Sequence, residues 1–515
     1  MRTKNFIKNF KAGLVKQLLT EFLRFFVRTV FIYTLSAEYL GINGLFTNIL
    51  TFLSIAELGF STSVSYALYK PLANGDTEGI KSIICLYKKA YRFIGMLVFA
   101  IGMLIMPFLP HLTQGGTDLV NIYFVFFLYL INIVSGYLFF AYRTTILHAD
   151  QKAHIAYKVT SYAQLLLCVF QLGSLILFRN HKELSFYLYN ISQVVTTIFI
   201  NLYTAKITNK LYPYLTQKDV QPLEKAIKDK IFNNIKALSL SNISAVLLRS
   251  IDSIVISAFM MNGLFTIGLY SNYVVLLDAV TSFLKILTNS LVAGMGNFYV
   301  TESKEKNKEL LNGLDLAYFW MFGFCAVCYY ALIQPFIGFI WLDETYLLSN
   351  RVAFLVALNF TIGAPMGGVL RYINSAGLYY ETRYRYIVSA VLNVVLSILF
   401  VSTFNWGVEG VILATTICTF FSHILLPITV YKNIFKESSG TYYVNYFVKI
   451  ITLVGTIYIT RLVCDILLPN INLLTFVGRA LIAVMLPNLL WVVMFGRTHS
   501  FIFAKEKALG IIKNR

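Results

Sequence analysis

Residues 20–69 read TEFLRFFVRTVFIYTLSAEYLGINGLFTNILTFLSIAELGFSTSVSYALY, and two apolar runs in this stretch decide the fold class. In the first run, Glu21, Arg24 and Arg28 share one helical face because they are three and four residues apart. The second run carries a similar polar stripe at Ser54, Glu57, Ser61 and Ser65. A charge at mid-bilayer costs about 2.5–3.5 kcal/mol, so such faces turn away from lipid. The stretch therefore predicts membrane helices around a polar interior.

Length and composition agree with a membrane protein. The chain has 515 residues, of which 57% are hydrophobic and only 13% charged, and its mean hydropathy is +0.68. Soluble domains carry roughly 25% charged residues. No cleavable signal peptide is expected, since the basic residues 1–11 precede an apolar run without a small-residue cleavage site.

Fourteen apolar segments of about 20 residues each, the length that crosses a bilayer core, follow one another along the chain. Their approximate limits are 14–36, 44–69, 91–110, 119–142, 157–178, 185–205, 236–259, 265–295, 313–340, 350–373, 386–403, 408–430, 444–467 and 474–495. The connections between them are short. We therefore predict an all-α polytopic membrane protein with about 14 transmembrane helices and no soluble domain.

The distribution of basic residues sets the orientation. Of the 43 Lys and Arg residues, 33 lie on alternate loops and the two tails, three lie on the opposite loops and seven lie within the spans. This bias predicts that both termini are cytoplasmic. The net charge of +19 is thereby explained by topology, and we expect no nucleic-acid partner.

A sequence repeat divides the chain. Residues 44–48 (GLFTN) open the second span, and residues 268–272 (GLYSN) open the eighth. Residues 262–266 match residues 43–47 residue for residue (NGLFT) at a different offset, so the register of the repeat stays open. An offset of six spans preserves orientation, which predicts a parallel repeat about an axis along the membrane normal. We therefore expect a six-helix bundle at residues 1–230, a second at 231–440, and two further helices with a basic tail at 441–515.

Charged residues inside the spans are the candidate site. The polar faces of the first, second, seventh and eighth spans occupy equivalent places in the two halves, which predicts a hydrated cavity between the bundles. Its candidate substrate-binding residues are Arg24, Arg28, Arg249 and Lys285. Its candidate coupling or charge-balancing acids are Glu57, Asp252 and Asp278. Each charge can also be structural, because intramembrane ions either pair or function. Arg249 and Asp252, three residues apart, can neutralise each other.

Other chemistry is not expected. The sequence has no Gly-x-x-x-x-Gly-Lys-Ser/Thr phosphate-binding loop, so nucleotide hydrolysis by that route is excluded. Cys325 and Cys328 lie within a span without a second Cys or His pair, so we interpret them as small buried residues and predict no metal site. We expect no enzymatic activity and no cofactor apart from a coupling proton or sodium ion.

Several motifs resemble one family of exporters. Residues 40–46 (LGINGLF), 57–60 (ELGF), 66–73 (YALYKPLA), 149–152 (ADQK) and 268–272 are similar to segments of the polysaccharide-repeat-unit flippases. These flippases belong to the superfamily of multidrug, oligosaccharidyl-lipid and polysaccharide exporters. Residues 26–28 (FVR) are also similar to a basic position in the first helix of the lipid II flippases, where arginines are thought to meet the lipid pyrophosphate.

The resemblance implies a function. A member of this family would move undecaprenyl-pyrophosphate-linked oligosaccharide across the bacterial plasma membrane by alternating access, in polysaccharide biosynthesis. Its partners would be that glycolipid, the bilayer, and a polysaccharide polymerase with its chain-length machinery. Two alternatives remain open: a cation-coupled exporter of small molecules from the same superfamily, and a membrane polysaccharide polymerase. Such polymerases carry a sizeable external loop, and here the external loops are short.

Overall fold

The computed structural model describes residues 2–57, 59–113, 118–217, 219–376 and 378–513. Within these ranges the chain consists of helices and short connections, without a strand. The predicted all-α fold class is confirmed.

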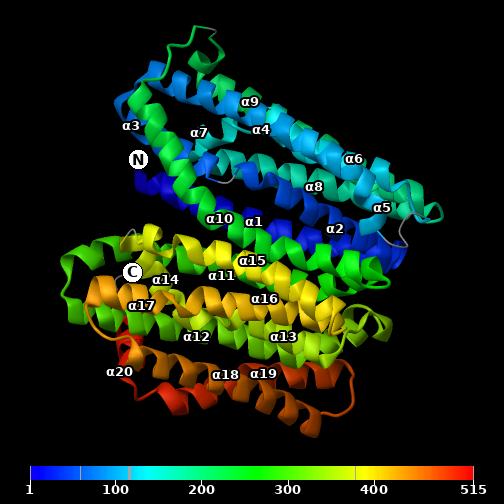
Figure 1. The fold of residues 1–515 in the computed structure, drawn as a ribbon, viewed down its shortest axis with the longest axis vertical. Coiled ribbons are helices and arrows are strands. Elements are labelled where there is room, and N and C mark those ends of the chain that lie inside the picture. Colours follow the sequence, from blue (N-terminus) through cyan, green and yellow to red (C-terminus); the bar gives the residue numbers. More distant parts are fainter. Residues whose placement is uncertain (1, 58, 114–117, 218, 377, 514–515) are drawn as a thin grey trace. The chain divides into compact units, whose positions relative to one another are not determined.

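The chain divides into two compact units, residues 1–268 and 269–515. The helices of the first unit are α1 (Arg2–Thr34), α2 (Ala37–Leu53), η1 (Ser54–Glu57), α3 (Phe60–Asn74), α4 (Thr77–Ile105), η2 (Met106–Phe108), α5 (Leu109–Leu112), α6 (Ile122–Leu138), α7 (Arg143–Ala149), α8 (Ala153–Leu177), α9 (Lys182–Leu211), η3 (Pro213–Thr216) and α10 (Lys225–Phe259). Helix α11 (Gly263–Thr301) begins at the end of this unit and continues into the second (Figure 1).

The second unit contains the remaining helices. They are α12 (Lys304–Pro335), η4 (Phe336–Trp341), η5 (Glu344–Tyr346), α13 (Asn350–Thr361), η6 (Ala364–Met366), α14 (Gly367–Ala376), α15 (Tyr379–Ser402), α16 (Gly407–Ile424), α17 (Leu426–Val430), η7 (Tyr431–Phe435), α18 (Gly440–Leu467), α19 (Leu473–Phe495) and α20 (His499–Lys513). Helix α10 belongs to the first unit because it packs on α2 and α3. The division at residues 230 and 440 follows the sequence repeat instead, and it stays a prediction.

Each of the fourteen predicted segments coincides with a helix or with helices joined across a short break. Among the described residues, eight helices are long and apolar enough to cross a membrane, and the bent pair α6 and α7, at 55° to each other, is a ninth candidate. The other segments are not among these candidates; within the described residues, α10 and α15 offer only the shorter apolar stretches Ser250–Phe259 and Ile387–Ser402. The chain is therefore a multi-pass membrane protein, and the count of fourteen is approximate.

Of the breaks within the predicted segments, two bear on the polar residues described below. The segment predicted at 44–69 was expected to be continuous, but the structure interrupts it at η1 and at Gly59, whose φ is +92°. The expectation of a continuous helix was wrong. The polar stripe keeps helical spacing across the break, so the sequence pattern does not reveal the break. The segment predicted at 350–373 is interrupted at η6, between α13 and α14. Gly363, Pro365, Gly367 and Gly368 predict that break.

The first unit is held by aromatic contacts between its helices. Helix α1 packs along α8, and α9 packs on both α6 and α8. Phe31 of α1 contacts Phe186 and Tyr189 of α9 edge-on, with ring centroids 6.0 and 5.1 Å apart. Phe46 of α2 contacts Phe126 of α6 at 5.2 Å. These contacts fix the relative positions of α1, α2 and α9, which carry the polar residues described below.

Helix α2 also crosses the first turns of α11 at very short range. A Cβ atom at Gly41 would lie 2.6 Å from the carbonyl carbon of Leu264 and still closer to its oxygen. A Cβ at Gly268 would lie 2.8 Å from the carbonyl carbon of Ala37. Only glycine permits two backbones to approach so closely, as at the small-residue crossings of membrane helices. One glycine of the repeated motif, Gly268, is thereby explained by packing.

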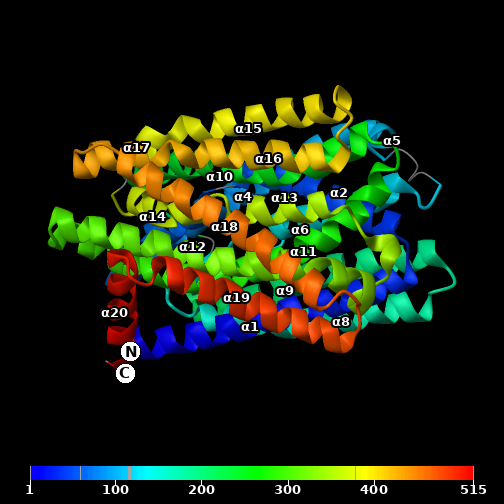
Figure 2. The same ribbon diagram turned by 90° about the horizontal axis from the view of Figure 1, so that it is seen from below.

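The second unit centres on α12. Helices α13, α18, α19 and α20 all pack on it, while α15 and α16 lie side by side in both views (Figures 1 and 2). Near the break at η6, a buried apolar cluster includes Leu311, Met366, Val369, Leu426 and Phe435. This cluster joins α12, α14, α17, η7 and α18. The two C-terminal helices α18 and α19 are thus part of the packed unit.

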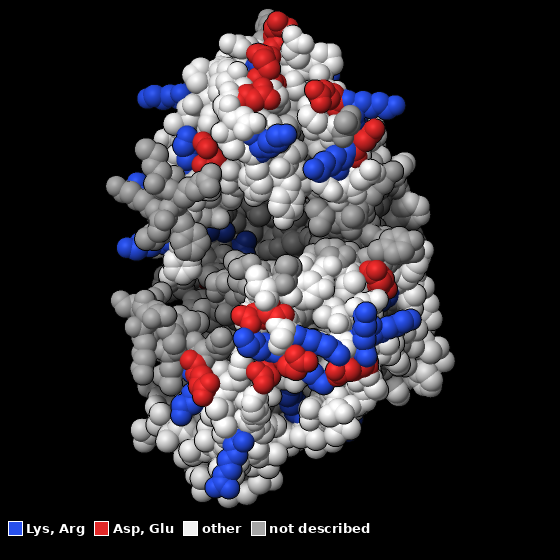
Figure 3. Space-filling model, turned by 90° about the vertical axis from the view of Figure 1, so that its left-hand side faces the viewer, with Lys and Arg blue, Asp and Glu red and all other residues white. Residues whose placement is uncertain are grey.

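Figure 3 shows the side of the molecule that lies on the left in Figure 1, where charged side chains of both units are exposed. In the second unit, Lys304 and Lys308 at the start of α12 both bind Glu437, with N–O distances of 2.8 and 2.7 Å. These residues belong to loops that the basic-residue count places in the cytoplasm. The orientation itself stays a prediction.

Candidate functional site

Glu57 lies at the break in the second predicted span. Helix α2 ends at Leu53, where the Ser54 hydroxyl donates to the Leu50 carbonyl at 2.7 Å. The chain then makes the single turn η1, and α3 begins after Gly59, whose left-handed conformation suits a residue without Cβ. The turn η1 packs against α2, α4 and α10. A carboxylate is therefore held in the interior of the first unit, at a point where the backbone is irregular.

Phenol groups surround this carboxylate. The Tyr91 hydroxyl donates a hydrogen bond to Glu57 Oε1, and the Tyr87 hydroxyl donates to the Tyr91 oxygen at 2.7 Å. Tyr137 of α6 reaches both Ser54 and Glu57 with its hydroxyl. The rings of Tyr91 and Tyr137 are in contact, at 5.5 Å. All three tyrosines are buried, so the donors are fixed in place by packing.

The network continues beyond Glu57. Tyr87 also lies within hydrogen-bonding reach of Ser61 on α3 and Thr145 on α7. Hydroxyl groups that both donate and accept can reorient when a carboxyl gains or loses a proton. A carboxyl at this place can accept from Tyr91 when ionised and donate to a phenol oxygen when protonated. The arrangement is suited to an acid that exchanges a proton or meets a cation.

The sequence pattern points to Glu57 but not to its tyrosine partners. Tyr87 and Tyr91 are four residues apart, so they share one face of α4. That spacing was the available signal. In a chain with 34 Tyr residues, however, it does not distinguish these two from tyrosines that only pack.

Arg24 and Arg28 face a second polar site, between α1, α8 and α9. A cavity of about 130 Å³ is lined by Arg24, Gln164, Gln171, Tyr189 and Gln193, together with Leu23, Val27, Leu167 and Cys168. Arg28 interacts electrostatically with Tyr189, whose hydroxyl reaches the Asn43 and Gln171 side chains. A guanidinium beside amides and a phenol can hold a phosphate or a sugar hydroxyl. The structure thus brings the first two predicted basic residues into one polar environment.

The other predicted residues are more dispersed. Asp252 is buried on α10, next to Ser253, which accepts a hydrogen bond from Asn48 of α2 at 2.7 Å. Asp278 is half-buried and Lys285 is exposed, two turns apart on α11 in the second unit. The side chain of Arg249 lies outside the described residues. The predicted cavity between the two bundles, and the role of these residues in it, stay predictions.

A further acid, Asp315, lies at the break of the tenth predicted span. Its Oδ1 atom accepts from the Gly368 N–H at 2.6 Å, and Oδ2 accepts from the Tyr442 hydroxyl at 2.7 Å. Tyr446 donates to the Ile362 carbonyl at 2.9 Å, on the other side of the break. Asp315 is fully buried, and the charge of Lys449 acts on it. Residues of α12 and α18 thus satisfy the backbone groups that the break exposes.

Asp315 is not among the acids predicted from the sequence. Asp315 lies within a predicted span and so carried the same signal as Asp252 and Asp278. Tyr442, Tyr446 and Lys449 lie at spacings of four and three, on one face of α18. That pattern could have pointed to a polar contact in the core. No group of three His, Cys, Asp or Glu suited to a metal ion occurs among the residues that the structure describes.

No protein-family model and no curated protein sequence matches the chain. Solved structures do. The structure of the lipid II flippase MurJ in an inward closed conformation matches with a TM-score of 0.62 and 15% identity, over 95% of this chain and 99% of that one. A eukaryotic MATE transporter matches at 0.56 and 12%, over 83% and 96%. An inward-facing multidrug resistance MATE family transporter of the MOP superfamily matches at 0.54 and 16%, over 81% and 94%.

The chain has the fold of these transporters. The match to the flippase leaves about a twentieth of this chain uncovered, fewer residues than the segment 441–515 contains. It therefore extends over most of the segment 441–515, which follows the predicted twelve helices. At these identities the likeness establishes the fold alone, and function has to be argued from the site.

Proposed function

We propose that this protein is a flippase. It moves undecaprenyl-pyrophosphate-linked oligosaccharide repeat units from the cytoplasmic to the outer leaflet of a bacterial plasma membrane, and both of its termini are cytoplasmic. The observation that carries the proposal is the polar pocket of Arg24, Gln171 and Tyr189, with Arg28 beside it, between α1, α8 and α9 of a chain with this exporter fold. The length of the match to a lipid flippase supports it.

The pocket provides the groups that such a substrate needs. Guanidinium groups can bind a pyrophosphate through paired hydrogen bonds. The side-chain amides of Gln164, Gln171 and Gln193 and the Tyr189 phenol can serve sugar hydroxyls, since amides both donate and accept. The lipid tail stays in the bilayer throughout. In the proposed cycle, the two bundles rock about a cavity to which Arg249 and Lys285 contribute from the second half.

Glu57 is the proposed coupling acid. Transport against a gradient needs an energy source, and a proton or sodium ion bound at a carboxylate would supply it. Glu57 is supported by its place at a helix break and by its phenol partners, whose hydroxyls can both donate and accept. In this proposal, Asp252 is the counter-ion of Arg249 in the same unit. Asp278 is a further acid, in the second half of the chain.

A cation-coupled exporter of small molecules is the second candidate. The MATE matches favour it, since they have the same fold at TM-scores of 0.54 and 0.56. The two candidates differ in the substrate that accumulates when the protein is absent. Depletion of a flippase raises the amount of lipid-linked glycan on the cytoplasmic leaflet. Depletion of a drug exporter instead raises sensitivity to toxic compounds.

The test is depletion of the chain in its host, with analysis of the lipid-linked glycans on each leaflet. Arg28→Ala should fail to restore export, and Arg28→Lys should restore it poorly, because an ammonium lacks the planar fork of a guanidinium. Lys182→Ala, at an exposed site at the start of α9, is the matched control. Unchanged glycan distribution on depletion would refute the proposed function. Normal export by Arg28→Ala at normal protein level would remove Arg28 from the site.

A further inference from the structure

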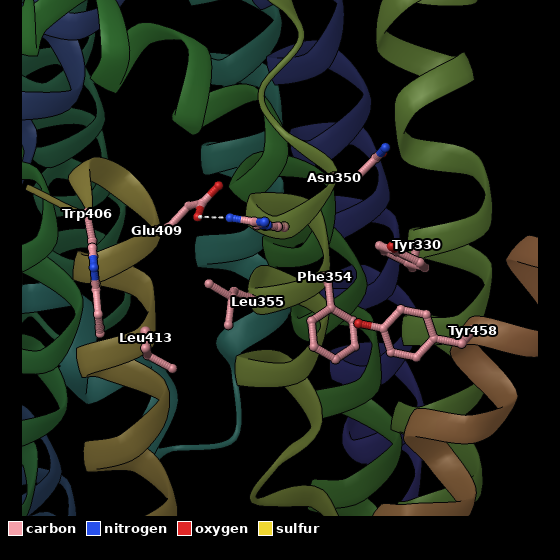
Figure 4. Close-up of a pocket in the computed structure, with 9 residues that line it drawn as sticks. Tyr330, Asn350, Phe354, Leu355, Trp406, Glu409, Leu413 and Tyr458 are labelled. Atoms are coloured by element: carbon pink, nitrogen blue, oxygen red, sulfur yellow. Dashed lines mark ion pairs between the residues drawn. The ribbon is translucent and has the colours of Figure 1, made fainter.

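A surface groove of the second unit lies over the start of α13 (Figure 4). Helix α16 forms one wall, and α12 and α18 form the other. The groove has a volume of about 460 Å³, within the range of about 300–1,000 Å³ that is usual for small-molecule sites. It lies in a different unit from Glu57, Arg24 and Arg28.

The lining changes from polar to apolar along the helices. Three polar residues in the first turns of α13 and α16 are each followed, four residues later, by an apolar one. These pairs are Asn350 with Phe354, Arg351 with Leu355, and Glu409 with Leu413. One helical turn advances about 5.4 Å along the axis. The mouth of the groove is therefore charged, while its body, one turn further into the membrane-spanning helices, is apolar.

The two charges at the mouth are adjacent but not hydrogen-bonded. Glu409 Oε2 lies 3.9 Å from Arg351 Nη1, and Glu409 Oε1 accepts from the Ser349 hydroxyl at 2.7 Å. The Arg351 side chain is 84% exposed and that of Glu409 is 33% exposed. A ligand that carries both an anionic and a cationic group can therefore approach the two side chains together.

Aromatic side chains complete the groove. Tyr330, Phe354 and Tyr458 pack on one another, with ring centroids 5.0 to 6.1 Å apart. Trp406 lies on the opposite side, stacked on Phe404 at 5.2 Å. Trp and Tyr are typical of the membrane interface, where one part of the ring is in an apolar environment and another is hydrated. The groove thus has the layout of an interfacial site.

We propose that the groove binds a zwitterionic phospholipid with a primary amine. Its phosphate lies on Arg351, its ammonium on Glu409, and the first part of one acyl chain lies along Phe354, Leu355 and Leu413. A guanidinium matches a phosphate, and a carboxylate accepts hydrogen bonds from an ammonium. The lipid belongs to the leaflet at which α13 and α16 begin, which the basic-residue count assigns to the outer side. This site is independent of the substrate that the chain transports.

The test uses the full-length protein, purified and stripped of lipid in detergent. Native mass spectrometry would measure the binding of short-chain phosphatidylethanolamine, phosphatidylcholine and phosphatidylglycerol. We expect phosphatidylethanolamine to bind most tightly. Glu409→Gln should remove that preference, with a loss of about fivefold, the upper range for one partly exposed charge pair. Arg351→Ala should weaken the binding of all three lipids.

Two further variants keep the test decisive. Glu344→Gln changes an exposed acid of η5 outside the groove and should leave lipid binding unchanged. Leu413→Trp would fill the apolar body and should weaken all three lipids even if a charge variant proves unstable. Equal binding of the three lipids by the wild type would overturn the proposal, since a non-specific lipid shell has no headgroup preference. A preference that survives Glu409→Gln in folded protein would overturn it as well.

Discussion

We expect a substitution at the crossing of α2 and α11 to destabilise the protein by an amount that the structure allows us to work out. In Gly41→Ala, the added Cβ would lie 2.6 and 2.9 Å from the carbonyl carbon and Cα of Leu264. Those atoms are backbone, so the helices must move apart. Overpacking of this kind costs typically 1–3 kcal/mol, and the gain in helix propensity from Gly to Ala returns up to about 1 kcal/mol. We expect a net loss of about 1–2 kcal/mol.

A series of glycines tests this reasoning internally. Gly268→Ala should behave like Gly41→Ala, because its Cβ would meet the backbone of Ala37. Gly44→Ala should be milder, since its Cβ would meet only the side-chain methyl Cγ2 of Ile267, at 3.1 Å. Gly136→Ala and Gly173→Ala are the controls, because nothing lies within 4 Å of their added Cβ atoms. These two should be neutral or slightly stabilising.

The assay is thermal unfolding of the purified protein in one detergent, followed by thiol-reactive dye or intrinsic fluorescence. A protein with two units need not unfold in a single step, so the comparison is the order of the first transition across the series. The expected order is Gly41 and Gly268 lowest, Gly44 intermediate, and Gly136 and Gly173 at or above wild type. If Gly41→Ala unfolds at the same temperature as Gly173→Ala, the close crossing does not exist in the protein.

Three further predictions concern the acids and the topology. In proteoliposomes with an imposed proton or sodium gradient, Glu57→Gln should abolish the response of transport to the gradient, and Tyr91→Phe should reduce that response. Tyr66→Phe changes an exposed ring and should leave the response unchanged. If transport by wild type and by Glu57→Gln is equally indifferent to both gradients, Glu57 is excluded from coupling. Tyr442→Phe should lower thermal stability, because it removes a hydrogen bond to the buried Asp315 carboxylate, and such a bond is worth about 1.5–3 kcal/mol. Tyr162→Phe, at an exposed ring, serves as the control. An unchanged unfolding temperature of Tyr442→Phe would show that Asp315 does not depend on Tyr442. Reporter fusions after Lys218, Lys306 and Lys436 should read cytoplasmic and those after Gly115 and Asp343 external, and an external reading at Lys436 would refute the proposed arrangement.

Much of the fold could be predicted from the sequence because hydrophobic length and charge asymmetry are local signals. Every segment predicted from an apolar run of about 20 residues coincides with helical structure. The breaks near Pro365 and at Gly59 differ in how far the sequence predicts them. The break near Pro365 was foreseeable, since proline lacks an N–H and clashes with the preceding turn. The break at Gly59 was not, because a single glycine is tolerated within membrane helices.

The candidate site was harder to predict from the sequence than the fold, and the reason is physical. Arg24 and Arg28 stand out because a charge in an apolar run is rare. Gln171 and Tyr189, which meet them, lie on helices far along the chain and carry no charge. The same holds for Tyr442 and its contact with Asp315, separated by more than a hundred residues. Which neutral residues complete a site depends on helix packing, and one sequence carries little information about packing.

The breaks at η1 and η6 indicate different roles for the acids beside them, Glu57 and Asp315. A break exposes backbone groups that cannot stay unpaired in a membrane interior. In the second unit, Asp315 accepts the Gly368 N–H, and it is therefore committed to closing the break. In the first unit, the bonds described for Glu57 come from the side chains of Tyr91 and Tyr137. Among the residues that the structure describes, no backbone group pairs with the Glu57 carboxylate, so a change in its protonation state leaves none of these groups unpaired.

This difference ranks Glu57 ahead of Asp315 as the acid that responds to an ion. Neutralising Asp315 should act first on stability, since the amide of Asp315→Asn must serve both the Gly368 N–H and Tyr442 with a single oxygen. Neutralising Glu57 should act first on coupling, because Tyr91 can still donate to the amide oxygen of Glu57→Gln. A coupling defect without a stability defect at residue 57, and the reverse at residue 315, is the pattern that separates a working acid from a structural one.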